Sequence, residues 1–161
     1  MPRLSPSEIL EVATTLERNG EKFYREAERK FDDPEIRETF RFLAQEEVKH
    51  ERLFAKLLAQ LTSYEPPEQF TEEYFGYLRA YVTDVVFTES RFDELVAGIT
   101  DPIAAVRFAK QREQDTILFY LELRELIPTT ERKVIDEIIQ EERLHYFKLS
   151  RLESARTHLR A

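Results

Sequence analysis

Two halves of the chain repeat one sparse pattern of polar residues. Each half has a Glu, a Tyr seven residues later, and a Glu-x-x-His that begins about thirty residues after the first Glu. The pattern consists of Glu17, Tyr24, Glu47 and His50 in the first half and of Glu113, Tyr120, Glu142 and His145 in the second. Four carboxylates and two imidazoles are the ligand set that a carboxylate-bridged pair of metal ions needs inside a four-helix bundle.

Apolar residues at three- and four-residue steps predict four long helices. Ser7 is the expected N-cap of the first helix, and Asp33 that of the second, with Pro34 at the first helical position. The predicted helices run from Ser7 to about Phe31, from Pro34 to before Pro66, from Thr100-Asp101-Pro102 to about Ile127 and from Thr130 onward. Short connections within each pair of helices predict two antiparallel hairpins.

Residues 64–100 join the two hairpins and are too many for a plain loop in a compact domain. The apolar spacing between Tyr74 and Val86 predicts a helix of about 20 residues there, roughly 30 Å long. The predicted fold class is therefore all-α: a four-helix bundle of two antiparallel hairpins with a long helix-containing crossover. Residues 1–161 are expected to form a single domain.

The four glutamates of the pattern are predicted to face the core. Residues three, four and seven apart share one face of a helix, and each of these glutamates lies within the apolar stripe of its own helix. An unpaired buried carboxylate is costly, whereas two divalent ions balance four carboxylates. His50 and His145 each lie one turn beyond a core glutamate. A single Glu-x-x-His on a helix is common without metal, but its duplication, each time after a core-facing Glu, favours metal binding. Tyr24 and Tyr120 could serve packing alone.

Composition excludes several other functions. The chain has no cysteine, which rules out disulfides, cysteine-bound metal sites and a thiol nucleophile. Its net charge of −8 argues against nucleic-acid binding and favours attraction of cations. No apolar run approaches the roughly 18 residues of a membrane span, and the N-terminus lacks an apolar signal core, so a cytoplasmic location is expected.

At these positions the sequence resembles the rubrerythrin family of ferritin-like di-iron proteins. The resemblance is carried by the segments Glu17–Tyr24, Leu43–His50, Ala109–Tyr120 and Ile139–His145. It implies two iron ions per chain, bridged by Glu47 and Glu142. Glu17 and His50 would complete one site, and Glu113 and His145 the other. Ligand type alone also permits manganese.

Related di-iron bundles imply roles for further residues. The acid before each Glu-x-x-His glutamate would orient the histidine of the opposite half, which pairs Glu141 with His50 and Glu46 with His145. Tyr24 and Tyr120 would relay protons. Val48 stands where a haem-binding Met would be expected in a bacterioferritin, so no haem is predicted.

Two departures from the family pattern matter. The chain has no cysteines for a rubredoxin iron site, so electrons are expected from a separate donor such as a rubredoxin-like protein. Thr116 replaces an extra glutamate found in rubrerythrin itself, and Gly20 holds the corresponding position in the first half. Both residues are small, which is expected to leave space beside the metals for dioxygen or peroxide.

The resulting hypothesis is a non-haem di-iron oxidoreductase that reacts with hydrogen peroxide or dioxygen in defence against oxidants. The alternatives are a ferroxidase or iron-storage protein of the ferritin–bacterioferritin type, a di-manganese catalase-like site, and a helical interaction module without metal. A homodimer is expected, with the Tyr- and Val-rich crossover as a candidate surface.

Overall fold

The computed structural model describes residues 5–61, 64–65, 69–86 and 89–158, and within these ranges it contains six α-helices and no strand. The helices are α1 (Pro6–Lys30), α2 (Pro34–Gln60), α3 (Glu72–Val85), α4 (Glu89–Gly98), α5 (Pro102–Leu126) and α6 (Arg132–His158). The predicted all-α fold class is confirmed, with α3 and α4 forming the crossover between the hairpins α1–α2 and α5–α6.

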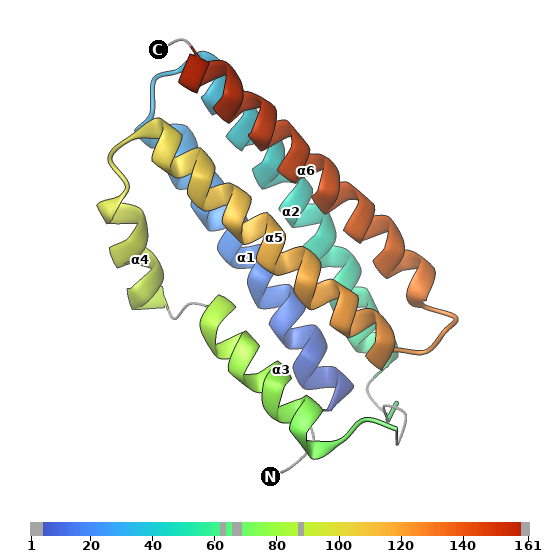
Figure 1. Cartoon of the computed structure of the whole chain (residues 1–161). Helices are drawn as coiled ribbons and strands as arrows, with labels where there is room; N and C mark the ends of the chain where they lie inside the picture. The colour runs from blue at the N-terminus through green and yellow to red at the C-terminus, as the bar shows by residue number, and fades with distance from the viewer. Residues whose placement is uncertain (1–4, 62–63, 66–68, 87–88, 159–161) are drawn as a thin grey trace.

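The two hairpins pack into a four-helix bundle in which α1 lies against α5 and α2 lies against α6 (Figure 1). The crossover helices cover one side of this bundle, because α4 contacts α1 and α3 contacts α5. No helix in the described part of the chain is both long enough and apolar enough to span a membrane.

The helix starts follow their capping residues, with one correction. Ser5, not Ser7, caps α1: its hydroxyl accepts a hydrogen bond from the Glu8 amide, and the Glu8 carboxylate accepts one from the Ser5 amide at 2.7 Å. This reciprocal capping box needs an acid three residues after the cap, which Ser5 has. Asp33 caps α2 as predicted, and Asp101 caps α5 at the predicted start of that helix. The fourth long helix begins at Arg132, two residues later than predicted, after a turn in which the Glu131 amide bonds the Pro128 carbonyl.

The crossover holds two helices rather than the single helix of about 20 residues predicted from its sequence. Helix α3 ends at Val85, because Val86 adopts an extended backbone. The Tyr81 hydroxyl donates to the Asp115 carbonyl at 2.6 Å and so ties α3 to α5. Lys22 and Lys30 of α1 bind Asp93 and the Val96 carbonyl, respectively, and hold α4 on α1.

Two apolar clusters fill the bundle, one toward each end. The first contains Leu10, Phe54, Phe75 and Leu123 among others, and the second contains Phe23, Phe40, Val106 and Leu149 among others. The buried polar side chains of the repeated pattern belong to neither cluster, although both pattern tyrosines do. The apolar core is therefore divided along the bundle, and the division is where the candidate site lies.

Asp33 links the start of α2 to the end of α6. Its carboxylate accepts from the Glu35 and Ile36 amides at 3.1 Å and from two Arg156 nitrogens at 2.7 and 2.8 Å. The Arg156 hydrogen bonds are the main cause that lowers the pKa of Asp33 from 3.8 to about 2. A carboxylate with a depressed folded-state pKa stabilises the fold above its unfolded pKa and loses that contribution as the pH falls.

We expect Asp33→Ala to lower the free energy of unfolding at pH 7 by about 1–2 kcal/mol, the usual cost of a lost N-cap. Asp33→Asn keeps the capping acceptor but not the charge. The stability difference between wild type and Asp33→Asn should therefore be full above about pH 4 and vanish toward pH 2. Urea unfolding of both proteins across this pH range, in the presence of a metal chelator, measures this stability difference. A difference independent of pH would contradict the lowered pKa of Asp33.

Candidate metal centre

The six predicted ligands converge at the middle of the bundle, in the division between the apolar clusters. Helix α1 supplies Glu17, α2 supplies Glu47 and His50, α5 supplies Glu113, and α6 supplies Glu142 and His145. All six are at most 5 % exposed. Charged side chains are rarely buried to this degree unless they are paired or bind metal.

The six side chains form two overlapping groups. Glu17, Glu47, His50 and Glu142 each offer a ligand atom within 4.8 Å of the others, and so do Glu47, Glu113, Glu142 and His145. Glu47 and Glu142 belong to both groups. The geometry thus brings together the side chains that the family resemblance would assign to two ions, with the same two glutamates shared between them.

Atoms that converge on the centre of the first group are close but poorly hydrogen-bonded. His50 Nδ1 lies 2.8 Å from Glu142 Oε1 and 3.5 Å from Glu17 Oε2. None of these three atoms has a hydrogen-bond partner of acceptable geometry. Buried polar atoms without partners are rare in native proteins. Oxygen and imidazole donors aimed at one another in this way fit a pair of bound metal ions.

The pKa directions show how strongly the site needs positive charge. Burial, followed by repulsion from Glu17, raises the pKa of Glu47 well above its ordinary value. Burial and Glu142 do the same for Glu113. Burial opposes the charged form of His50, but Glu142 and Glu17 outweigh it and raise the pKa of His50 to about 12. Without metal, the site therefore retains protons that compensate its carboxylates.

The two tyrosines connect the two halves of the repeat. Tyr24 on α1 donates a hydrogen bond to Glu113 on α5, and Tyr120 on α5 donates one to Glu17 on α1. Burial raises the pKa of both hydroxyls well above 10, so they stay protonated and act as donors. Each candidate ligand on α1 or α5 is thus held by a tyrosine of the other half. Their predicted role in proton relay stays a prediction.

The outer edges of the histidines have different neighbours. His50 Nε2 lies 2.7 Å from the carboxylate of Glu141, so the structure brings this predicted pair together. The second predicted pair is not brought together: Glu46 accepts a hydrogen bond from Lys49 at 2.5 Å, and His145 packs edge-on against Phe42. Lys49 lies one helical turn beyond Glu46, and this local cation pairs with the half-buried carboxylate.

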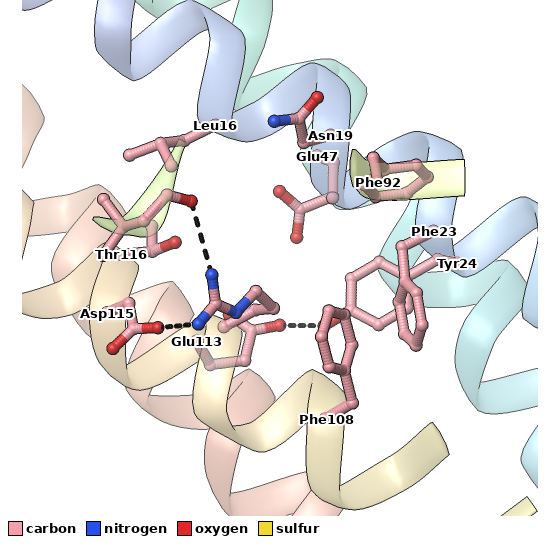
Figure 2. A pocket seen from close by; sticks show the side chains of 13 residues that line it. Leu16, Asn19, Phe23, Tyr24, Glu47, Phe92, Phe108, Glu113, Asp115 and Thr116 are labelled. Carbon is pink, nitrogen blue, oxygen red and sulfur yellow. Dashed lines mark hydrogen bonds and ion pairs between the residues drawn. The ribbon is translucent and has the colours of Figure 1, made fainter. Parts of the chain in front are cut away.

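Gly20 makes room for Glu47. A Cβ atom placed at Gly20 would lie 2.9 Å from Glu47 Oε2 and 3.0 Å from its carboxyl carbon. The glycine therefore lets a carboxylate shared by both ligand groups approach the α1 backbone. Gly20 and Thr116 also both line a small pocket that reaches Glu47 and Glu113 (Figure 2).

The pocket contains residues that the sequence pattern did not identify. Its wall includes Asn19, Phe92, Phe108, Arg112 and Asp115 (Figure 2). Arg112 forms an ion pair with Asp115 and donates to the Val85 carbonyl at 3.3 Å, which ties α5 to the end of α3. In the sequence Asn19 lies next to Gly20, and Arg112 lies next to Glu113. Only the packing of the crossover shows that Asn19 and Arg112 share one cavity.

Comparison with known proteins agrees with this geometry. Residues 8–153 match the family model described as Rubrerythrin. A solved structure from Thermotoga maritima, provisionally described as a ferritin-like diiron-carboxylate protein, matches with a TM-score of 0.71 and 30 % identity. The match covers 96 % of this chain and 97 % of that one. A comparison with curated proteins gives no match.

The two helical glycines Gly20 and Gly76 form a matched pair for testing the centre. Replacement of either by Ala should stabilise its helix by about 1 kcal/mol. An added Cβ at Gly76 meets nothing within 4 Å, whereas at Gly20 it displaces the Glu47 carboxylate. We expect Gly20→Ala to weaken metal binding by about tenfold or more, and Gly76→Ala to leave it unchanged. Isothermal titration of the apoproteins measures this, and equal affinities would show that the space at Gly20 is not needed for metal binding.

Proposed function

The chain belongs to the rubrerythrin family, and from this premise we propose that it is a di-iron oxidoreductase that reduces hydrogen peroxide. The observation that carries the proposal is the pairing of a buried six-ligand cluster with a pocket that ends on two of its glutamates. A purely structural ion site would not need such access.

Glu17 and His50 would hold one ion, Glu113 and His145 the other, and Glu47 and Glu142 would be shared between them. Two ferrous ions would supply the two electrons that convert hydrogen peroxide and two protons into two water molecules. Tyr24 and Tyr120 hold protons within hydrogen-bonding distance of Glu113 and Glu17, which supports a role in delivering the required protons.

The structure around the site favours reduction of hydrogen peroxide to water over release of partly reduced oxygen species. Apolar side chains close the site on both sides along the bundle, and the crossover helices contribute Val85 and Phe92 to the wall of the pocket. Exclusion of bulk water strengthens electrostatic interactions at the site and limits side reactions. The electrons must be renewed after each turnover, because the cysteine-free chain has no rubredoxin-type iron site of its own. We propose a separate protein donor for this purpose.

Anaerobic loading of the apoprotein with Fe(II) should give about two ions per chain, and the loaded protein should be oxidised by hydrogen peroxide faster than free Fe(II). Glu47→Gln should lose most of this capacity, because Glu47 belongs to both ligand groups. Glu38→Gln is the matched control, since Glu38 is an exposed glutamate on the same helix. Metal analysis and stopped-flow absorbance provide the readouts, and a loaded protein no faster than free Fe(II) would refute the peroxidase.

The same preparation separates the alternatives. A ferritin-type storage shell would elute from size exclusion at many times the mass of a dimer. A catalase-like di-manganese site would evolve oxygen from peroxide without any electron donor after loading with Mn(II). The proposed peroxidase with iron bound should neither elute as a shell nor evolve oxygen. It should consume peroxide continuously only when a reductant is supplied.

A further inference from the structure

The pocket over the centre is small enough to discriminate among oxidants. Its volume is about 30 Å³. A cavity that holds one water molecule needs at least roughly 10–15 Å³, so the pocket has room for a guest of only a few atoms. Hydrogen peroxide and dioxygen have two heavy atoms, whereas bulky organic hydroperoxides such as tert-butyl hydroperoxide have more.

The lining of the pocket combines candidate ligands with an unsatisfied donor. Gly20, Glu47, Glu113 and Asn19 line it, and the side-chain amide nitrogen of Asn19 is buried without a hydrogen-bond partner. An amide NH₂ group can donate two hydrogen bonds. A buried donor that lines a cavity of this size is suited to bind an oxygen atom of a small guest.

Aromatic rings form much of the wall. Phe92 of α4 is 2 % exposed and lines the pocket together with Phe23 and Phe108, whose ring centroids are 4.9 Å apart. Lys22 of α1 fixes the position of Phe92, because its ammonium group lies 5.0 Å from the ring centroid and 2.6 Å from Asp93. The crossover thus contributes a buried aromatic side chain directly to the wall of the cavity.

We propose that this pocket is the oxidant-binding site, that Phe92 restricts it to oxidants of two heavy atoms, and that the Asn19 amide donates a hydrogen bond to the bound oxidant. The inference rests on the proposed peroxide chemistry but assigns residues outside the candidate ligand set. It gives a reason for the small residue Thr116, because a larger side chain there would fill the space that the guest needs.

The size filter is tested by comparing hydrogen peroxide with tert-butyl hydroperoxide as oxidants of the Fe(II)-loaded protein. Wild type should react much faster with hydrogen peroxide. Phe92→Ala should accelerate the tert-butyl hydroperoxide reaction by about tenfold or more relative to the hydrogen peroxide reaction. Val96→Ala is the matched control, because Val96 is a buried residue of α4 in the same apolar cluster but does not line the pocket. Similar rates for both oxidants in wild type, or equal effects of the two variants, would overturn the filter.

The donor is tested with Asn19→Leu, which keeps a similar volume without a polar group. The concentration of hydrogen peroxide that gives the half-maximal rate should rise between about twofold and tenfold, as expected for one lost hydrogen bond. Metal content and maximal rate should stay the same. An unchanged half-maximal concentration would show that Asn19 does not bind the oxidant.

Crystals of the zinc-loaded protein provide a readout that needs no turnover, since zinc is redox-inert. After a soak in hydrogen peroxide, wild type should show a two-atom guest in contact with Asn19 Nδ2, and Asn19→Leu should not. A guest seen in these crystals together with unreactive iron-loaded protein would refute the proposed function alone. Reactive iron-loaded protein with an empty pocket after the soak would refute the inference alone.

Discussion

The structure depends on four carboxylates buried at one level of a helical bundle. Each helix of the bundle contributes one of them, and none is more than 5 % exposed. Apolar packing on either side of this level cannot compensate their charge, and the unpartnered atoms of Glu17, His50 and Glu142 show that hydrogen bonding does so only in part. Bound cations would satisfy both the charge and the open lone pairs. The ligand set, the small residues around it and the crossover that covers it can all be understood as consequences of that requirement.

The repeat also explains how the two hairpins recognise each other. Tyr24 and Tyr120 each reach across the α1–α5 contact to a glutamate of the opposite half. Neither half can satisfy its own first glutamate in this way. Burying the two sets of ligands therefore requires that both hairpins dock in one register, which connects correct assembly of the bundle to formation of the site.

Much of this could be predicted from the sequence because it follows from helical periodicity. The fold class and the convergence of the four glutamates depend on residues that share a helix face, and the cap Asp33 is marked by the proline that follows it. The errors arose where local alternatives compete. Ser5 and Ser7 are both possible caps, and only the position of Glu8 selects Ser5. Glu46 could reach either His145 or Lys49, and the nearer cation on its own helix prevails. The crossover was predicted as one helix because its apolar stripe weakens without an obvious stop signal.

The pocket was beyond prediction for a different reason. Its walls come from α1, α2, α3, α4 and α5, so no periodic pattern in any one segment marks it. Asn19 and Phe92 are 73 positions apart in the chain and share the cavity because Lys22 and Lys30 hold α4 against α1. The ligands are thus encoded by a repeat that both hairpins carry, whereas access to them is encoded by the crossover, which occurs once. Under the proposed function, chains with the same six candidate ligands would therefore differ in the oxidants they accept through changes in α4 alone, without any change to the centre itself.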